Sequence, residues 1–386
     1  MGKKLILVAI ILLALISISG CDQGSIDIDK KETALPTRAP TEATPNPPPR
    51  SHSFYIHEVP LNIETNGMDL YVSDVSGNLA LFQLSEKIVY EIEKDAFDAY
   101  FLTREIGIYD MSAGKTVVSW TPEFEGYCMG GVITGQRSAI CPIDKSRSAG
   151  ISGEYDIVSF DSKQTLLGTI KGSHYAMNTL SDGKVLISYD DTGLNHDRFG
   201  VKLFDGKDMS DLILYDRSNG RKSVNSHLYT YENSFCWPFI QDHNLTFVVS
   251  NMSAGTEFYA ALDSANQKLD GYCMSQYGLL AEVSPEGQHY NQLLLYDGTS
   301  WKTVIDKLDT HLFRMVSGGN TAICVNLSWK VLAVVDLETD SPKIMQVDPK
   351  GIAGFTDHGV MTFASGPNSY VLFDSTDNAL YRIIID

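Results

Sequence analysis

The sequence predicts an all-β protein, namely a single β-propeller of four-stranded blades that follows a signal peptide and a tether rich in proline and threonine. From Ser53 to Asp386, short runs of Val, Ile, Leu, Tyr and Phe alternate with turns rich in Gly, Asp, Ser and Asn. A strand that ends in Asp before a polar turn recurs along this region, and a second short pattern recurs between these hairpins. Such repetition at a spacing of about 40–50 residues is typical of a propeller.

The composition is that of a globular protein with an acidic surface. The chain has 386 residues, 43% of them hydrophobic, and a formal net charge of −18. An acidic surface repels phosphate backbones, so we expect no nucleic acid among its partners. Six cysteines in a chain of this length do not form a disulfide scaffold.

The N-terminus has the pattern of an export signal. Two lysines precede the apolar run Leu5–Ile16, which is shorter than the roughly 20 residues that span a bilayer and matches the apolar region of a secretory signal. The run ends in ISGC at Ile18–Cys21, which resembles the lipobox of bacterial lipoproteins. In that family the Cys thiol carries a diacylglyceryl group and the signal is removed before it.

The resemblance implies lipidation at Cys21 and a position on the extracytoplasmic side of a bacterial cell membrane, because two acyl chains give stable anchoring. We therefore expect a lipoprotein signal peptide over residues 1–20, a lipidated Cys with a disordered tether over residues 21–52, and the propeller over residues 53–386. Six of the 14 prolines lie between Pro36 and Pro49, and chain of this composition forms an extended spacer. The alternative is an ordinary cleaved signal in which the Cys is incidental.

Eight strands end in Asp before a turn. Their last residues are Asp74, Asp110, Asp161, Asp216, Asp263, Asp297, Asp336 and Asp374. We expect each Asp side chain to accept backbone N–H groups of the turn that follows it. Counting these hairpins predicts eight blades. The alternative is seven, with a strand near Phe54–Ile56 that pairs with the last blade, because Phe54–Asp74 is short for three strands.

A second repeat marks another strand of the unit. The sequence EGYCM at Glu125–Met129 recurs as DGYCM at Asp270–Met274, and a Ser or Thr precedes His at His174, His227 and His311. Each of these follows a hairpin and precedes two further strands, so the unit contains about four strands. One such sheet cannot bury both of its faces, whereas sheets stacked in a ring can. A β-solenoid and a pair of β-sandwiches are the alternative folds.

Two local points stay open. Residues Ser85–Phe101 fit a helix as well as strands, because apolar residues recur at a spacing of four. Five cysteines remain after Cys21, and Cys128 would lie diagonally opposite Cys141 across a hairpin with a turn at Gly135-Gln136. A bridge between the two would need a bulge, which Gly130-Gly131 can supply.

Two hairpins resemble the repeat of quinoprotein-like propellers, in which Asp, three residues and Gly form the turn between the last two strands. Asp110 and Asp216 both show this spacing. The family has a docking Trp after the turn, whereas here Trp120 lies two places late and the second hairpin has none. The resemblance covers about two blades. Together with related WD-like propellers that are anchored by lipid, it implies a scaffold in envelope assembly.

Catalytic motifs are mostly absent from the sequence. It contains no HExxH and no GxSxG, and Gly114-Lys115-Thr116 lacks the first glycine of a P-loop. A quinone dehydrogenase of the resembled superfamily would show adjacent cysteines, and no two cysteines here are neighbours. We assign no catalytic residue, no cofactor and no metal site. The acids near Asp190 and Asp205 are interpreted as turn residues, with a calcium-binding loop as the alternative.

The candidate binding site is the mouth of the central channel. We interpret His174, His227 and His311 as opening innermost strands, whose equivalent ends meet at one mouth, and we interpret Tyr127 and Tyr272 as coming from equivalent strands. Together these five side chains would line a binding site. The alternative is that each His caps its own strand or packs between blades.

These observations predict a monomeric, non-catalytic, lipid-anchored module that binds an envelope protein or a glycan, because propeller faces are broad, rigid and carry loops. One alternative is a propeller enzyme that acts on an extracellular glycan or small molecule at the central channel, since the fold alone does not exclude catalysis. A sensory domain coupled to a membrane protein is another.

Overall fold

The computed structural model describes residues 54–93, 96–128, 130–145, 154–172, 174–191, 198–216, 219–224, 227–263, 266–308, 313–326, 331–337, 343–347 and 360–385. All of them lie in the larger of two compact units, Pro45–Asp386. Their regular structure consists of β-strands. Within these ranges no helix is long and apolar enough to cross a membrane. The expected signal peptide, Cys21 and the tether lie outside the described residues.

The described strands form seven sheets, which are numbered here as blades 1 to 7. Each is given from its innermost strand outwards. Blade 1 consists of β2 (Asp69–Ser76), β3 (Leu79–Glu93), β4 (Ala96–Asp110) and β5 (Lys115–Trp120). In blade 2 the innermost position is shared by β6 (Tyr127–Cys128) and β7 (Val132–Gly135), followed by β8 (Ser138–Asp144), β9 (Glu154–Phe160) and β10 (Gln164–Lys171). Blade 3 consists of β11 (His174–Thr179), β12 (Val185–Asp190), β13 (Arg198–Phe204) and β14 (Met209–Asp216).

The other four blades follow the same order. Blade 4 consists of β16 (Tyr229–Tyr231), β17 (Ser234–Gln241), β18 (Asn244–Asn251) and β19 (Thr256–Leu262), and β15 (Arg221–Ser223) pairs with the far end of β17. Blade 5 consists of β20 (Gln267–Ser275), β21 (Gly278–Pro285), β22 (Asn291–Tyr296) and β23 (Trp301–Leu308). Blade 6 consists of β24 (Phe313–Gly318), β25 (Thr321–Asn326), β26 (Val331–Asp336) and β27 (Lys343–Val347). Blade 7 consists of β28 (Val360–Gly366), β29 (Ser369–Asp374), β30 (Ala379–Ile385) and β1 (Phe54–Val59).

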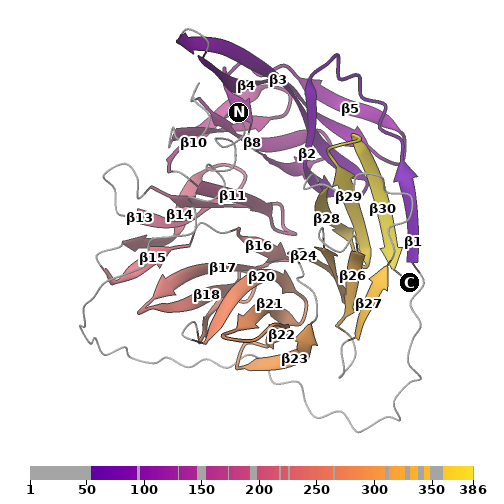
Figure 1. Cartoon of the computed structure of the whole chain (residues 1–386). Helices are drawn as coiled ribbons and strands as arrows, with labels where there is room; N and C mark the ends of the chain where they lie inside the picture. Colours follow the sequence, from indigo (N-terminus) through magenta and orange to yellow (C-terminus); the bar gives the residue numbers. More distant parts are fainter. Residues whose placement is uncertain are drawn as a thin grey trace. The chain divides into compact units, whose positions relative to one another are not determined.

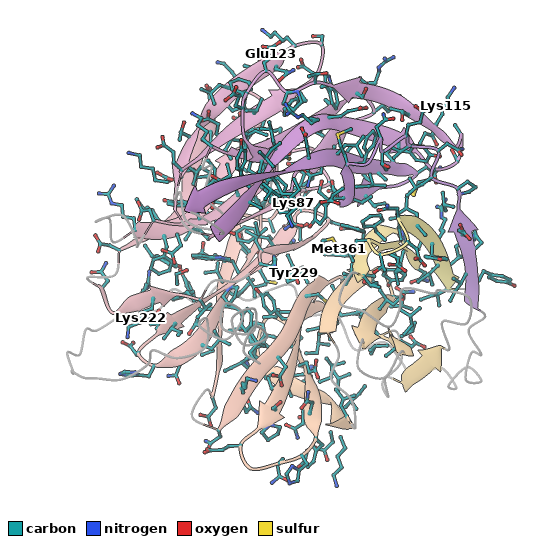
Figure 2. The ribbon with its side chains drawn as sticks, turned by 45° about the horizontal axis from the view of Figure 1, so that its top comes forward. Lys87, Lys115, Glu123, Lys222, Tyr229 and Met361 are labelled. Carbon is teal, nitrogen blue, oxygen red and sulfur yellow. The ribbon has the colours of Figure 1, made fainter. Side chains whose placement is uncertain are left out.

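The innermost strands form a closed ring (Figure 1). β2 contacts β7, β7 contacts β11, and the series continues through β16, β20, β24 and β28 back to β2. In Figure 2, Tyr229 of β16 and Met361 of β28 lie toward the middle of the ring, whereas Lys115 of β5 lies at its outside. Four-stranded sheets in a closed ring are a β-propeller. The predicted all-β fold is therefore confirmed, and the solenoid and the two sandwiches are excluded.

The hydrophobic core is divided among the seven seams between neighbouring blades. Each of seven buried clusters combines side chains from two adjacent blades. Phe82 of blade 1, for example, packs with Phe373 of blade 7, and Ile108 of blade 1 packs with Phe160 of blade 2. Because both faces of a blade are covered, inner strands such as β12 are buried at every residue, and β12 begins with three apolar residues in succession instead of the alternation of a half-exposed strand.

The propeller has seven blades, so the best count of eight is wrong and its alternative of seven is right. β1 does not begin a blade of its own. It pairs antiparallel with β30, from Phe54 opposite Ile385 to Val59 opposite Leu380, and so completes blade 7. The first strand of the described chain therefore closes the ring with the last one.

The count failed because an Asp at the end of a strand does not mark one fixed position in a blade. Asp74 and Asp110 both lie in blade 1, in its first strand and at the end of its third. Asp216 ends the outermost strand of blade 3, and Asp263 follows the outermost strand of blade 4. Any strand can end at an Asp turn, because the hydrogen bonds involved are local.

The expected role of Asp in these turns is confirmed at four of the eight strand ends, Asp110, Asp161, Asp297 and Asp374, whereas the Asp74 carboxylate accepts the N–H group of Ile133 in blade 2. The Asp110 carboxylate accepts the hydroxyl of Ser112 (2.6 Å) and the N–H groups of Ser112 (2.9 Å) and Ala113 (3.0 Å). These bonds, first of all that of the Ser112 hydroxyl, hold the pKa of Asp110 below its usual value. The same arrangement begins at Asp161, Asp205 and Asp297.

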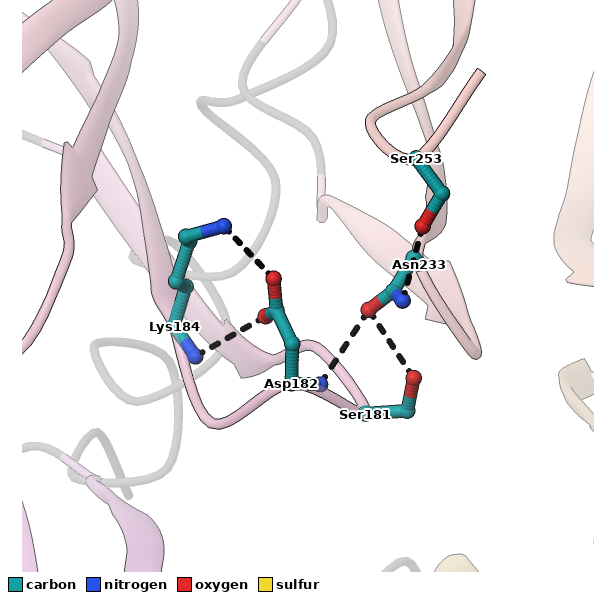
Figure 3. Close-up of polar contacts among 5 residues, drawn as sticks. All are labelled: Ser181, Asp182, Lys184, Asn233 and Ser253. Atoms are coloured by element: carbon teal, nitrogen blue, oxygen red, sulfur yellow. Dashed lines mark hydrogen bonds and ion pairs between the residues drawn. The ribbon is translucent and has the colours of Figure 1, made fainter. Parts of the chain in front are cut away.

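Side-chain amides connect neighbouring blades at the turns between first and second strands. In Figure 3, Asn233 Oδ1 of blade 4 accepts the Ser181 hydroxyl (2.9 Å) and the Asp182 N–H (3.2 Å) of blade 3. Its Nδ2 donates to Ser253 Oγ (2.9 Å), and Lys184 Nζ donates to Asp182 (2.6 Å). One turn residue therefore joins two blades.

This arrangement is repeated around the ring. In four blades the carbonyl oxygen of the turn Asn accepts an N–H group at the end of the third strand or just after it, as Asn78 accepts that of Met111 at 2.8 Å. Asn78 Oδ1 also accepts from Arg382 of blade 7 (2.6 Å), and Asn368 Oδ1 accepts from Thr321 of blade 6 (3.1 Å). We call these four residues the amide belt: Asn78, Asn233, Asn320 and Asn368.

The connection from β1 to β2, which links blade 7 to blade 1, is held by Tyr109. The side chain of Tyr109 is fully buried. Its hydroxyl donates to the carbonyl oxygen of Pro60 (2.6 Å) and accepts the N–H group of Asn62 (3.1 Å). One side chain in the third strand of blade 1 therefore fastens the closing segment of the ring.

We expect Tyr109→Phe to lower the free energy of unfolding by about 1–3 kcal/mol, because it leaves two backbone groups without their partner in a part-buried place. Denaturant unfolding of both proteins measures this difference. Tyr55→Phe is the control, since the Tyr55 side chain is 55% exposed. Equal stability of the Tyr109→Phe variant and the unmodified protein would contradict the role assigned to this hydroxyl.

Candidate functional site

All innermost strands begin at one face of the ring, which we call the mouth face. Each is reached from the outermost strand of the preceding blade. Matching ends of neighbouring innermost strands are bonded to each other. Thr179 Oγ1, at the end of β11, donates to the Ile133 carbonyl (3.3 Å), and Thr230 Oγ1 donates to the Thr179 carbonyl (3.3 Å). The amide belt lies at this far end, and the turns between second and third strands lie at the mouth face.

Blade 1 extends past the mouth face. β3 pairs with β2 from Leu79 to Ser85, and from there to Glu93 it pairs with β4 alone among the described strands. We call residues 86–102 the extended hairpin; it carries Lys87, which is labelled in Figure 2. Side chains on it are exposed although apolar: Val89 is 58% and Phe101 36% accessible. The segment that fitted a helix as well as strands is thus a strand pair.

Tyr127 lies beside the extended hairpin. It forms β6 with Cys128, pairs with Asp144 of β8, and its ring centroid is 5.6 Å from that of Phe101. Burial raises the pKa of Tyr127 to about 12, and the neighbouring Tyr71 adds to the rise. Its hydroxyl is therefore protonated at neutral pH and can act as a hydrogen-bond donor at the mouth.

His227, Tyr229 and Tyr272 form a second group, at the seam between blades 4 and 5. The Tyr272 hydroxyl donates to the His227 carbonyl oxygen, and its ring lies edge-on to that of Tyr229 with centroids 5.0 Å apart. The His227 and Tyr229 rings are 6.1 Å apart. The side chain of Tyr272 is buried, whereas His227 is exposed. Of these three, His227 and the half-buried Tyr229 have surface that a ligand can contact.

Tyr127 and Tyr272 lie at different depths despite the shared GYCM sequence. Tyr127 is opposite Asp144, the last residue of β8, whereas Tyr272 is opposite Ala281 in the middle of β21. Tyr127 precedes the last residue of its inner strand, Gly135, by eight residues, whereas Tyr272 precedes Ser275 by only three, so Tyr127 lies nearer the mouth. Of the predicted site residues whose side chains are described, Tyr127 lies beside blade 1, and His227 and Tyr272 lie together at the seam between blades 4 and 5.

The remaining predicted residues are only partly described. His174 opens β11 and pairs with Asp190, as expected for the start of an innermost strand, but its side chain lies outside the described part. His311 and Cys21 lie outside the described residues. Within those residues, no group of three or more His, Cys, Asp or Glu is arranged to hold a metal ion.

The extended hairpin is the feature of the mouth face that the sequence analysis missed. Its signal was present as two apolar-rich runs on either side of Lys94-Asp95, which together are long enough for a hairpin. The spacing of four between Ile88, Ile92 and Ala96 concealed it, because that spacing also fits one face of a helix.

Asp74 connects the innermost strands of blades 1 and 2. Its Oδ2 accepts the N–H group of Ile133 at 2.7 Å. Burial raises the pKa of Asp74 to about 6, although the N–H groups of Ile133 and Val75 act in the opposite direction. The carboxylate is therefore ionised at neutral pH at a cost in stability.

Comparisons with known proteins show the fold. No family model and no curated protein matches the chain. A chain from a structural analysis of two prolyl endopeptidases is similar with a TM-score of 0.52 and 10% identity, covering 83% of this chain and 50% of that one. The acylaminoacyl peptidase of Pyrococcus horikoshii matches with a TM-score of 0.48 and 11% identity over 80% of this chain and 50% of that chain. The Dos1 propeller matches with a TM-score of 0.44 and 11% identity over 82% of this chain and 94% of its own.

We expect Asp74→Asn to increase stability at neutral pH. The folded-state pKa of about 6 exceeds the value of 3.8 expected when unfolded, so the unmodified protein loses stability as pH rises from about 4 through 6. The neutral Asn avoids this loss and still offers an oxygen to Ile133. Above pH 7 the free energy of unfolding should be larger by about 1–2 kcal/mol, and the two proteins should converge near pH 4.

Urea unfolding at a series of pH values between 4 and 8 measures this effect. Asp69→Asn is the control, because Asp69 is an exposed carboxylate at the start of the same strand. A stability–pH curve of Asp74→Asn that runs parallel to that of the unmodified protein would contradict the assignment.

Proposed function

We propose that the chain is a lipid-anchored, extracytoplasmic propeller that binds a protein of the bacterial envelope, without catalysis, through the extended hairpin on its mouth face. The observation that carries this proposal is that β3 runs eight residues beyond the strand with which it pairs inside the blade. The rest of the propeller supplies a rigid support for this hairpin.

The edge of β3 that faces away from β4 offers hydrogen bonds to a partner. From Glu86 to Glu93, β4 occupies one edge of β3, and no described strand occupies the other. An unpaired strand edge is a template onto which an extended segment of another protein can add as a further strand. A glycan offers no such ladder of backbone groups, so this edge favours a protein partner.

Side chains on the hairpin suit the same kind of contact. Val89 and Phe101 expose apolar surface, and the Phe101 ring packs beside the ring of Tyr127 of blade 2. Exposed aromatic and apolar side chains on a rigid support are typical anchors of protein interfaces. Residues 86–102 contain five acidic side chains and two lysines, so we expect a basic partner strand.

The location is part of the proposal and rests on the N-terminal sequence. The lipobox-like ISGC at Ile18–Cys21 and the proline-rich segment after it would place the propeller at a distance from the bilayer. A long reach combined with a rigid ring fits a module that holds a second envelope protein.

Cys21→Ala should release the protein from the membrane fraction, because it removes the only thiol that the lipobox-like sequence presents for acylation. Fractionation of the native host followed by immunoblotting measures the change. Cys21→Ser is unsuitable as a control because it removes the same thiol, so Asp22→Asn serves instead. Unchanged membrane association of Cys21→Ala would contradict the anchor.

Phe101→Ala should weaken partner binding at least about tenfold, because a large exposed anchor is lost from the hairpin. In-cell cross-linking of the full-length protein, affinity purification and mass spectrometry first identify the partner, and titration calorimetry then compares affinities. Tyr55→Ala is the matched control, since Tyr55 is an exposed aromatic side chain on the outermost strand of blade 7.

A second variant replaces residues 87–101 by Asn-Gly, which joins the paired residues Glu86 and Leu102 by a two-residue turn. It should abolish binding while the melting temperature stays within a few degrees of the original. A partner that binds this variant normally would refute the hairpin as the site. Binding of a glycan, or turnover of a glycan or small molecule, by the variant would favour the alternatives of a glycan-binding module or an enzyme.

A further inference from the structure

Blade 2 contains two thiols that approach each other at a break in its innermost strand. Cys128 pairs with Ile143 of β8, and Cys141 precedes Ile143 by two residues, so both side chains lie on the same face of the sheet. They belong to one buried cluster in the seam with blade 1. Both are free thiols in the structure.

The antiparallel pairing of the inner strand, β6 and β7, with β8 is irregular near these two thiols. From Cys128 to Val132 the inner strand advances by four residues, whereas β8 advances by three, from Ile143 to Ile140. The hairpin turn is Gln136-Arg137, one residue later than the turn at Gly135-Gln136 used in the sequence analysis. The extra residue falls at Gly130-Gly131, so the bulge that a bridge would need is present in the fold.

Both sulfur atoms are directed toward this break. Cys128 Sγ donates to the carbonyl oxygen of Gly130 at 2.7 Å. A Cβ atom on Gly131 would lie 2.6 Å from Cys141 Sγ, so the Cys141 sulfur occupies the space that glycine leaves open. The neighbouring Cys128 thiol also adds to the rise that burial causes in the pKa of Cys141.

We propose that Cys128 and Cys141 form a disulfide bond when the protein folds in an oxidising compartment, and that this bond joins β6 to β8 across the Gly130-Gly131 break. In a regular ladder, diagonal neighbours are about 7–8 Å apart, slightly beyond what a disulfide accepts. The two glycines carry positive φ values of 140° and 151° and no side chain, so the backbone there can move to close the gap.

The reaction is a thiol–disulfide exchange with a disulfide oxidant of the compartment. The Cys128 and Cys141 thiols lose two protons and two electrons and form one S–S bond, and the oxidant is reduced to two thiols. The bond would fix Tyr127, the residue next to Cys128, beside Phe101 at the mouth face. This inference rests on the export that the proposed function includes, but not on the partner or the hairpin, because it concerns the redox state of a seam.

The test produces the full chain in one bacterial host, either exported or, without the first 20 residues, kept in the cytoplasm. Thiols are alkylated at lysis, and peptides are mapped by mass spectrometry without reduction. We expect a cross-linked pair that contains Cys128 and Cys141 in the exported protein, 2 Da lighter than the two thiol peptides together, and both residues alkylated in the cytoplasmic protein. Cys128→Ser should abolish the bridge, and Cys324→Ser, in the seam between blades 5 and 6, should leave it intact.

Reduction should lower the melting temperature of the exported protein by at least about 3 °C, and Cys128→Ser should remove this difference. Exported, folded protein with both thiols alkylated, or a bridge between any other pair, would overturn the proposal. In a second measurement, the cytoplasmic protein is unfolded in urea and refolded in a mixture of oxidised and reduced glutathione. Refolded protein without this bridge would also overturn the proposal.

Discussion

Each sheet of this protein has two apolar faces, and water is removed from both only when another sheet packs on each side. The seven buried clusters show the consequence, since each of them belongs to two blades and none to a single blade. An open row of blades would leave one face of the first blade and one of the last in water. The ring must therefore close. β1 completes blade 7, the Tyr109 hydroxyl holds the segment that leads from blade 7 to blade 1, and Asn78 of the amide belt accepts a hydrogen bond from Arg382 of blade 7.

The need for ring closure explains why the strands and seams of all blades are alike, whereas the turns at the mouth face differ. Strands and seams repeat because every blade must fit between two others. The turns at the mouth face carry no such restriction, and there blade 1 has its extended hairpin. The seam beneath it, between blades 1 and 2, holds an unusual set of groups: the half-buried carboxylate of Asp74, the thiols of Cys128 and Cys141, and Tyr127. Both proposals concern this one region, the first its exposed rim and the second its buried interior.

The sequence was sufficient for the class of fold, for the four-stranded unit and for the role of Asp in four of the eight turns, because each depends on residues close together in the chain. It was insufficient for the blade number, since Asp74 and Asp216 have the same local pattern as Asp110 but occupy different strands. The turns of the amide belt mark one fixed position in four of the blades, because each places an Asn directly before the second strand. Tyr127 and Tyr272 share a motif, yet they lie at different depths, because Tyr127 precedes the end of its inner strand at Gly135 by eight residues and Tyr272 precedes Ser275 by three.

The sequence by itself determined the local features: strand and turn residues, the repeat, and the export signal with Cys21 that we expect at its start. Only the tertiary structure decided that β1 belongs to the last blade, that residues 86–102 form a hairpin beyond the ring, and that Cys128 and Cys141 meet at a glycine break. The physical reason is that local hydrogen bonds and alternation act within a few residues, whereas ring closure, strand register and seam packing depend on residues that are distant in the chain and adjacent only after folding.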